Sequence, residues 1–442
     1  MEETVHVVAG WQVIAAAVIF LVCYAVIISE KINRSVIALS GALLMTVLGI
    51  VDLHGAYTKH IHWSTIFLLI GMMILVGIAN KSGIFQFLAI WTARSAGGDP
   101  KKILIRLAVL TALGAAFIDN VTMVLLIAPI TVAIANTLRI SPIPLLITQI
   151  LICNIGGAAT LVGDPPNIMI GLAAGLTFND FLIHVAPFII VLTALAIVFL
   201  RFYYAKHLHV EEHYKQKLME ADPKEYIRDM TLAKKSIVVF ALTMIGFLTH
   251  QYFHIEPAVV ALTGGTLLML IGTKEKDLEE VFHSVEWVTI FFFAGLFVLV
   301  GGLVEVGIIQ KLATWMIEVT SGNMTLTSLI MLWGAGLASA IIDNIPLVAT
   351  MIPMVQDMGA QMALAPTDMS TLWWSLALGA CLGGNGTLIA ASANLIVASV
   401  AAREGTPISF VDFLKVSIPV TLLTLVLATV YVYVVFIRLG FA

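Results

Sequence analysis

The chain has 442 residues, of which 60 % are hydrophobic and 11 % are charged, and its mean hydropathy is +1.02. Soluble domains carry about 25 % charged residues, so the composition excludes a soluble globular protein and predicts an all-α protein that crosses a bilayer many times. The three cysteines form no CxxC pair, so no disulfide framework is expected. No cleaved signal peptide is expected, because the N-terminal stretch lacks basic residues.

Apolar runs of about 20 residues, long enough to cross a bilayer as a helix, recur along the chain. In the first half we predict spans near 11–29, 35–51, 63–80, 143–175 and 186–205. In the second half we predict spans near 235–251, 256–272, 287–304, 371–402 and 416–438. The charged segment 206–234 mixes both signs and is expected to be a cytoplasmic linker between residues 1–205 and 235–442.

The two halves of the chain repeat one another. The pair Asp119-Asn120 recurs 224 residues later as Asp343-Asn344. Two longer stretches match in the same order: VIALSGALL from Val36 with VVALTGGTL from Val259, and GGAATLVGDPPN from Gly156 with GGNGTLIAASAN from Gly383. Matches in one order indicate an internal duplication. Because five crossings are an odd number, the second copy enters the membrane upside down, and we predict inverted repeats.

Residues 103–138 and 325–358 are apolar runs with a polar pair at their centres. Each half of such a run has about 16–18 residues, or about 24–27 Å of helix. We therefore predict two re-entrant helical hairpins that enter from opposite sides, with Asp119 and Asp343 at their tips. A buried carboxylate without a counter-charge is costly within a membrane and indicates a functional site, although two helix caps would give the same sequence.

The distribution of basic residues predicts the orientation. With the N-terminus outside, only Lys59, Lys311 and Arg438 of the 23 Lys and Arg residues lie on the outer side. Lys and Arg favour the cytoplasmic side of a membrane, so both termini are predicted to lie outside. We expect a multi-pass protein of a bacterial or archaeal inner membrane, with the lipid bilayer as its surroundings and no nucleic-acid partner.

Glycine-rich stretches interrupt the fourth and ninth spans. Pro165-Pro166 removes two backbone donors and disfavours helix at Asp164, so the helix must break there. Broken helices expose half-helix ends that bind ions, whereas close helix packing would also explain the glycines. The tips and the interruptions supply the candidate ion- or substrate-binding residues: Asp119, Asn120, Thr122, Gly156, Gly157, Thr160, Asp164, Asn167, Asp343, Asn344, Gly384, Asn385, Thr387 and Asn394.

The order of these motifs resembles the ion transporter superfamily, which includes the divalent anion/sodium symporters, the arsenite permease and the D-type sodium/proton antiporter. The branch of the melanosomal P protein is the most similar in its motifs. The resemblance implies an elevator-type secondary transporter, usually a homodimer, in which hairpins and broken helices form a moving domain. The Ser-Asn-Thr tips of the symporters match Asp119-Asn120-Val121 and Asp343-Asn344-Ile345, and their GTPPN motif matches 163–167.

The chain departs from the symporters at three positions, where Asp119, Asp164 and Asp343 replace hydroxyl residues. The predicted spans hold no Lys or Arg to neutralise these acids, which favours proton or metal-cation chemistry over a dicarboxylate substrate. Oxygen ligands suit hard cations, so we predict a Na⁺ or proton site formed by Asp119, Asn120 and Asp164, with no other cofactor. The repeat counterpart of Asp164 is Ala391, so the first half is predicted to hold the better cation site.

We therefore predict a non-enzymatic transporter, either a proton- or Na⁺-coupled permease for an anion or an arsenite-like solute, or a Na⁺/H⁺ antiporter. An intramembrane aspartyl protease is an alternative, because Asp119 and Asp343 are two buried acids. However, Leu161 occupies the position where the protease motif needs its first glycine. A channel with an Asp-Asn filter would line a pore by oligomer symmetry, which an internally duplicated chain does not indicate.

Overall fold

The computed structural model describes residues 9–29 and 31–441, and this part of the chain contains helices and no strand. The first half contains α1 (Gly10–Ser29), α2 (Arg34–Val47), α3 (Leu53–Gly55), α4 (Trp63–Lys81), α5 (Ile84–Ser95), α6 (Pro100–Ala115), α7 (Asn120–Thr137), α8 (Ile143–Gly157), α9 (Pro165–Ala174), α10 (Phe178–His184) and α11 (Ala186–Tyr203). After α12 (Glu212–Glu220) come α13 (Met230–Thr249), α14 (Pro257–Gly272), α15 (Leu278–His283), α16 (Trp287–Glu305), α17 (Ile308–Thr320), α18 (Met324–Ser339), α19 (Asn344–Met362), α20 (Pro366–Gly383), α21 (Ser392–Arg403) and α22 (Phe410–Tyr431). Short 3₁₀ or π-helical turns cover Ala56–His60, Pro223–Tyr226, Glu275–Asp277 and Val432–Arg438.

Seven of the described helices are long and apolar enough to cross a membrane: α1, α4, α7, α11, α13, α16, and α22 with its π-helical extension. The count becomes eight if α9 and α10, which are bent by 109°, form one span. Two of the ten predicted spans are shorter helices, α2 with 14 residues and α14 with 16. Helix α2 ends at Val47 rather than at 51, because Gly49 adopts a left-handed φ of +65°, which ends a right-handed helix.

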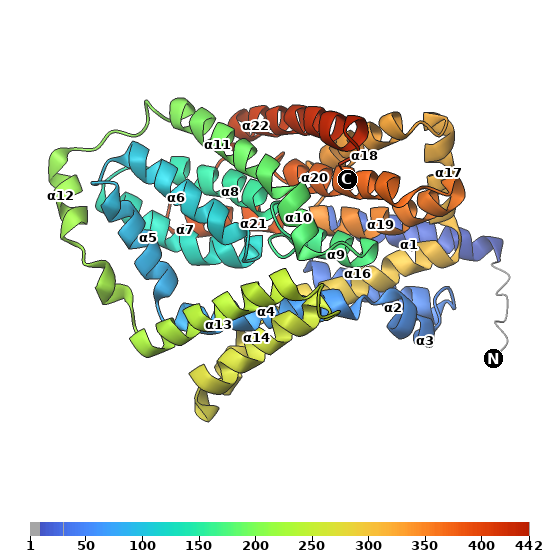
Figure 1. The fold of residues 1–442 in the computed structure, drawn as a ribbon, viewed down its shortest axis with the longest axis horizontal. Coiled ribbons are helices and arrows are strands. Elements are labelled where there is room, and N and C mark those ends of the chain that lie inside the picture. Colours follow the sequence, from blue (N-terminus) through green and yellow to red (C-terminus); the bar gives the residue numbers. More distant parts are fainter. Residues whose placement is uncertain (1–8, 30, 442) are drawn as a thin grey trace.

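The two polar pairs lie at the turns of helical hairpins, as predicted. In the first hairpin α6 contacts α7, and in the second α18 contacts α19. The helices α6 and α7 lie toward the left end of the molecule, whereas α18 and α19 lie toward the right end (Figure 1). The two hairpins therefore extend into the molecule from opposite ends of its long axis.

Two helix pairs are broken at the glycine-rich stretches. Helix α8 ends at Gly157 and α9 begins at Pro165, while α20 ends at Gly383 and α21 begins at Ser392. The residues just before the second helix of each pair, Asp164 and Ala391, are both extended, with φ of −140° and −148°. The second break thus has the same backbone shape as the first, although it lacks the Pro-Pro pair.

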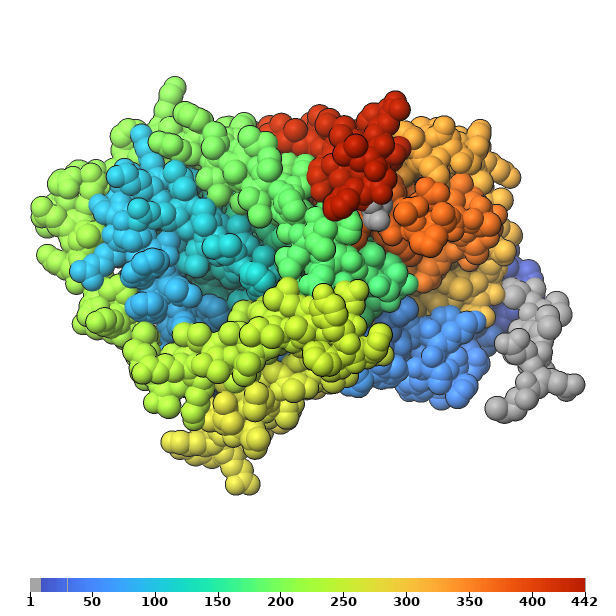
Figure 2. Space-filling model, viewed as in Figure 1, coloured from blue at the N-terminus to red at the C-terminus, as the bar shows by residue number. Residues whose placement is uncertain are grey.

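The helices form two groups, which we name by their content (Figure 1). The scaffold bundle contains α1, α2, α4, α13, α14 and α16, and the hairpin bundle contains α6–α9 and α18–α21. Helices of opposite halves are interlocked in both groups: α2 packs on α16, α14 on α4, α9 on α19, and α21 on α7. In the space-filling view, α13 and α14 of the scaffold bundle lie along the lower edge of the molecule, together with α15 (Figure 2).

Outward-facing apolar side chains fit a lipid environment. Leu21 on α1, Ile190 on α11 and Leu270 on α14 are all more than half exposed.

The segment between the repeats contacts the rest of the protein, because the backbone N–H of Arg228 donates to the carbonyl of Ser82 over 2.9 Å. Helix α13 begins at Met230, so its first turn lies within the predicted linker 206–234.

Candidate functional site

Both aspartates at the hairpin tips cap the helix that follows them. The Asp119 carboxylate accepts a hydrogen bond from the backbone N–H of Thr122 over 3.0 Å, and Asp343 accepts one from Ile345 over 3.0 Å. The two interpretations of the sequence therefore apply to the same residues: each aspartate is a helix cap and lies at a hairpin tip. Asp119 is only 6 % exposed, so its carboxylate is removed from bulk water.

The first tip is joined to the second break through Asn154, a buried residue of α8. The Asn120 amide donates to Asn154 Oδ1 over 3.5 Å. The Asn154 amide in turn donates to Asn385 Oδ1 and to Asn394 Oδ1, each over 2.9 Å. A chain of side-chain amides thus connects one hairpin to the broken helix of the other repeat. The sequence did not single out Asn154 as a site residue, although it lies beside Gly156-Gly157.

Several predicted ligands are used to hold the breaks in shape. The Asn167 amide donates to the carbonyl of Thr160 over 2.9 Å, and the Asn394 amide donates to the carbonyl of Thr387 over 2.9 Å. The Thr387 hydroxyl donates to the carbonyl of Ala340 over 2.8 Å, and the Thr160 hydroxyl makes the equivalent bond to Ala116. These four side chains therefore close each break and attach it to the hairpin of its own repeat.

One of the two pairs of equivalent glycines differs in how closely it is packed: Gly156 and Gly383 both lack room for a Cβ, whereas Gly157 is packed more tightly than Gly384. A Cβ at Gly156 would lie 2.7 Å from the carbonyl oxygen of Ala112, and a Cβ at Gly157 would collide with the Asn120 side chain. At Gly384 the nearest atom would be 3.3 Å away, a much weaker conflict. Close packing therefore explains the first pair of glycines, and at Gly157 the packed neighbour is a candidate site residue.

Asp164 contacts the second hairpin tip, whereas the sequence analysis assigned it to a site with Asp119 and Asn120. The Asn344 amide donates to Asp164 Oδ2 over 3.3 Å, and Asp164 is only 3 % exposed. The reason is the crosswise packing of the repeats, in which α9 lies against α19. The spacing of the motifs along the chain does not reveal that the first break contacts the tip of the second hairpin. The Na⁺ site formed by these three residues stays a prediction.

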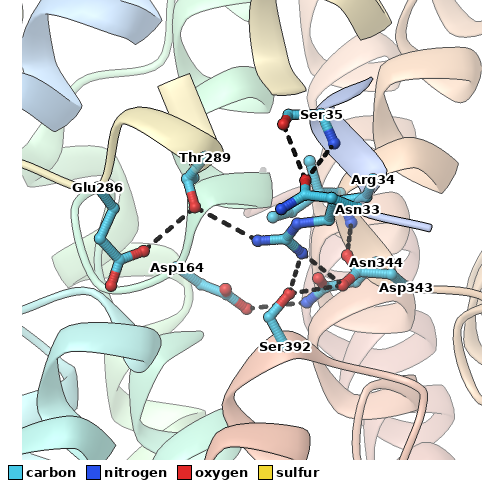
Figure 3. Close-up of polar contacts among 10 residues, drawn as sticks. Asn33, Arg34, Ser35, Asp164, Glu286, Thr289, Asp343, Asn344 and Ser392 are labelled. Carbon is cyan, nitrogen blue, oxygen red and sulfur yellow. Dashed lines mark hydrogen bonds and ion pairs between the residues drawn. The ribbon is translucent and has the colours of Figure 1, made fainter. Parts of the chain in front are cut away.

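Asp343 has a basic partner, so the prediction that no Lys or Arg neutralises the three acids is wrong for this residue. Arg34 Nη1 lies 3.4 Å from Asp343 Oδ2, and the Ser392 hydroxyl donates to the same oxygen over 2.7 Å (Figure 3). Arg34 also donates to Ser392. Among the described residues, no Lys or Arg nitrogen lies within 4.0 Å of the Asp119 or Asp164 carboxylates.

The sequence does not indicate Arg34 as a site residue, because its position just before the predicted span 35–51 is typical of a basic residue of the inner loop. In the structure it is the first residue of α2, whose N-terminus is capped by Asn33, which accepts a hydrogen bond from the backbone N–H of Ser35 over 2.9 Å. This cap fixes the direction in which the Arg34 side chain leaves the helix. The guanidinium lies 4.8 Å above the centre of the Phe292 ring, which shields one of its faces.

A second acid, Glu286, is linked to the other side of the Arg34 guanidinium. Arg34 Nη2 donates to the Thr289 hydroxyl over 3.3 Å, and this hydroxyl donates to Glu286 Oε2 over 3.1 Å (Figure 3). Burial, followed by the negative charge of Asp119, raises the pKa of Glu286 to about 7. Glu286 was overlooked because it precedes the predicted span 287–304, where an acid is common at a helix start.

A cavity of about 310 Å³ lies between the two bundles at this cluster. Its polar lining consists of Asn33, Arg34, Asp343 and Ser392, together with Tyr24. The remaining lining is apolar: Ile27, Ile28, Ile32, Val288, Phe292, Ile341, Ile342, Ile389, Leu395 and Ile396. Walls from α1, α2 and α16 face walls from the second tip and the second break, so any relative movement of the bundles changes the cavity.

Among the described residues, no group of three or more His, Cys, Asp or Glu side chains is arranged to hold a metal ion. The described acids of the site also have different partners: Asp119 caps α7, Asp164 accepts from Asn344, and Asp343 pairs with Arg34. Because the three carboxylates have different partners, the arrangement favours separate roles for them in binding a small molecule or ion. It is less suited to an aspartyl protease, in which two carboxylates share one water.

Comparison with known proteins identifies the kind of protein to which this chain is similar. Residues 24–379 match the family described as citrate transporter, CitMHS. An uncharacterized transporter of Mycobacterium tuberculosis is 42 % identical over 424 residues, which cover 95 % of this chain and 98 % of that protein. The P protein of Mus musculus is 30 % identical over 509 residues, covering 97 % of this chain and 61 % of its own length. The predicted resemblance to the P protein branch is confirmed.

Two solved transporter structures share the fold. The YdaH transporter of Alcanivorax borkumensis has a TM-score of 0.58 and 16 % identity, covering 97 % of this chain and 98 % of that one. MtrF of Neisseria gonorrhoeae, described as one of a class of antimetabolite efflux pumps, has a TM-score of 0.58 and 14 % identity, covering 97 % and 95 %. The all-helical transporter fold predicted from the sequence is confirmed.

Proposed function

The chain belongs to the citrate transporter family, and we propose that it is a secondary active transporter of a small organic anion, coupled to protons or Na⁺. The observation that carries this proposal is the cavity between the bundles, where Arg34, Asp343 and Ser392 form a polar patch within an otherwise mostly apolar lining. Guanidinium groups bind carboxylates strongly, and apolar walls suit a carbon skeleton. Arg34 therefore favours an anionic substrate over Na⁺/H⁺ exchange alone.

Asp119 and Asp164 are suited to bind the coupling cation. Both belong to the hairpin bundle, both are at least nine-tenths buried, and neither has a Lys or Arg partner among the described residues. A buried carboxylate without a counter-charge is costly, so a proton or a hard cation must neutralise it. The bound cation then moves with the bundle that carries it.

The hairpin bundle would move against the scaffold bundle in an elevator mechanism. The cavity is lined from both bundles, so sliding one past the other would close the cavity on one side and open it on the other. In the orientation set by the basic residues, the N-termini of α2 and α16 lie near the cytoplasm, so the cavity would open inward in this conformation. A homodimer held by the scaffold bundles completes this proposal.

Flux measurements test the proposed function. Full-length protein in liposomes would be assayed with citrate, a monocarboxylate, chloride, arsenite and Na⁺, each with and without imposed pH and Na⁺ gradients. We expect gradient-driven uptake of a carboxylate, loss of uptake in Arg34→Gln, and normal uptake in Arg403→Gln, which removes an exposed arginine at the end of α21. Na⁺ movement against protons without any carboxylate flux would contradict the proposal and support the antiporter.

Labelling tests the orientation separately. Lys215 lies in α12, in the segment that connects the repeats. A Lys215→Cys variant should be unreactive toward an impermeant thiol reagent added to intact cells and reactive in inverted vesicles. Labelling from outside in intact cells would reverse the proposed topology.

A further inference from the structure

Arg34 lies between two acids that belong to different bundles. On one side its guanidinium contacts Asp343 and Ser392 of the hairpin bundle, and on the other it reaches Glu286 of the scaffold bundle through Thr289 (Figure 3). Arg34 is the first residue of α2 and Glu286 directly precedes α16, and these two helices pack on one another. Their separation is therefore fixed within the scaffold bundle, whereas the contact with Asp343 crosses the boundary between the bundles.

Movement of the hairpin bundle, on which this inference rests through the proposed function, would remove Asp343 and Ser392 from Arg34. A half-buried guanidinium that loses its counter-charge must find another partner. Glu286 is the acid best placed to take over, because a single hydroxyl separates it from the guanidinium at distances of 3.3 and 3.1 Å. One change of side-chain conformation would bring the two charges into direct contact.

The charge state of Glu286 depends on the same movement. Among the described residues, the charged groups that act on it are Asp119 of the first tip, which disfavours ionisation, and Arg34, which favours it. With its pKa raised to about 7, Glu286 is poised between its two charge states at physiological pH. Departure of the hairpin bundle would take Asp119 away and leave Arg34 unpaired, and both changes favour the ionised form.

We propose that Glu286 is a proton-binding residue of the transport cycle and exchanges with Asp343 as the partner of Arg34. While Asp343 pairs with Arg34, Glu286 carries a proton. When the hairpin bundle moves, the Glu286 carboxyl releases this proton to water in the cavity, and the resulting carboxylate pairs with Arg34. Return of Asp343 reverses the step, so one proton is released and taken up at a residue that does not itself move.

The pair of positions that the duplication relates to Arg34 and Glu286 cannot make the same exchange. By the alignment of the repeats, the counterpart of Glu286 is His62 and the counterpart of Arg34 is Pro257. The His62 ring packs edge-on against Phe297, with ring centres 4.9 Å apart. The exchange of partners at Arg34, with the release and uptake of the Glu286 proton, would therefore have no counterpart at His62.

Cross-linking between the bundles provides the test without requiring a known substrate. The Tyr24 hydroxyl of α1 lies 2.8 Å from the Thr350 hydroxyl of α19, so a Tyr24→Cys/Thr350→Cys pair in a Cys23→Ala background reports whether the bundles hold this conformation. Full-length protein would be treated with a short bifunctional thiol reagent across a pH series. Between about pH 6 and pH 8 the equilibrium should shift by up to about tenfold per pH unit, so the yield should fall as the pH rises.

Glu286→Gln should keep a high cross-link yield at every pH, because its side chain cannot ionise. Glu286→Asp should restore the pH dependence, and Glu305→Gln, at the opposite end of the same helix, should leave it unchanged. A yield in the parent that does not change with pH, or a pH dependence that survives in Glu286→Gln, would overturn the proposal. The proposed function is judged independently by carboxylate flux in the parent, so the two can fail separately.

Discussion

The two hairpin tips have the same sequence pattern and the same backbone role, but their surroundings differ. The first tip is enclosed in protein: Asp119 has no basic partner among the described residues, and Asn120 is joined to a chain of buried amides. The second tip lines the cavity, where Asp343 pairs with Arg34. Duplication therefore preserved the fold of the two tips while their chemistry diverged.

The contacts of the breaks deepen this difference. The second tip receives Asp164 from the first break, whereas the corresponding residue of the second break is Ala391, which offers the first tip no ligand. Conversely, Asn154 reaches the second break, while its repeat counterpart, Cys381, donates only a weak hydrogen bond to Asn167 over 3.4 Å. The two halves thus share the same order of hairpin and broken helix, but each half supplies different chemical groups.

Replacing the two tip aspartates should give the largest effect and should separate the tips. Asp119→Asn and Asp343→Asn should each abolish coupled transport. Asp119→Asn should keep or raise stability, because it removes a buried charge that has no basic partner and keeps the capping oxygen. Asp343→Asn should lower the free energy of unfolding by about 1–3 kcal/mol, because it removes the charged partner that Arg34 has in this conformation.

Flux in proteoliposomes and thermal unfolding of the purified variants check this prediction. The Arg34→Gln/Asp343→Asn double variant is the control, and it should recover part of the stability that Asp343→Asn loses. Equal stability of the two single variants would mean that the ion pair at the second tip is energetically neutral.

Removing the acid from the first break should weaken cation binding. Asp164→Ala deletes a charged partner of Asn344, a loss of about 1.5–3 kcal/mol, or about tenfold to a hundredfold in apparent affinity. Ala391→Asp should change binding less, because the second break lacks the Pro-Pro pair that leaves backbone carbonyls free beside Asp164. Thermal stabilisation by Na⁺ and by protons would be titrated for both variants, and unchanged titrations in Asp164→Ala would reduce Asp164 to a structural role.

Adding a methyl group to one glycine of each repeat should reveal the difference in packing. Gly157→Ala forces the new Cβ against Asn120 and should cost about 1–3 kcal/mol of stability, as overpacked substitutions do. Gly384→Ala, its repeat counterpart, has more room and should change stability by less than about 0.5 kcal/mol. Denaturant or thermal unfolding of the two variants measures the difference, which should also appear as slower transport in Gly157→Ala.

The pH dependence of stability should show the smallest effect. Glu286 holds its proton more tightly in the folded protein, where its pKa is about 7, than in the unfolded chain, where it is 4.5. The unfolded chain therefore binds fewer protons in this interval, so the contribution of Glu286 to stability falls as the pH rises from about 4.5 to about 7. In Glu286→Gln the unfolding temperature should decline less over this range, and an identical profile would show that Glu286 is solvated.

The sequence by itself determined the elements of this protein and the positions of their irregularities. Repeated apolar runs, the recurring Asp-Asn pairs and the Pro-Pro and glycine stretches predicted two hairpins with Asp119 and Asp343 at their turns, and two broken helices. These features depend on residues close together in the chain: a side-chain cap acts within three residues, and a proline breaks the helix in which it lies.

Only the tertiary structure decided which of these elements meet. The crosswise packing of α9 on α19 gave Asp164 to the second tip, and the packing of α2 on α16 brought Arg34 and Glu286 to one cluster. Helix packing is set by the shapes of whole faces, and two faces of similar apolar composition are equivalent in sequence. The residues that join the bundles could therefore not be predicted from their spacing, and the charge of Asp343 was assigned without the arginine that balances it.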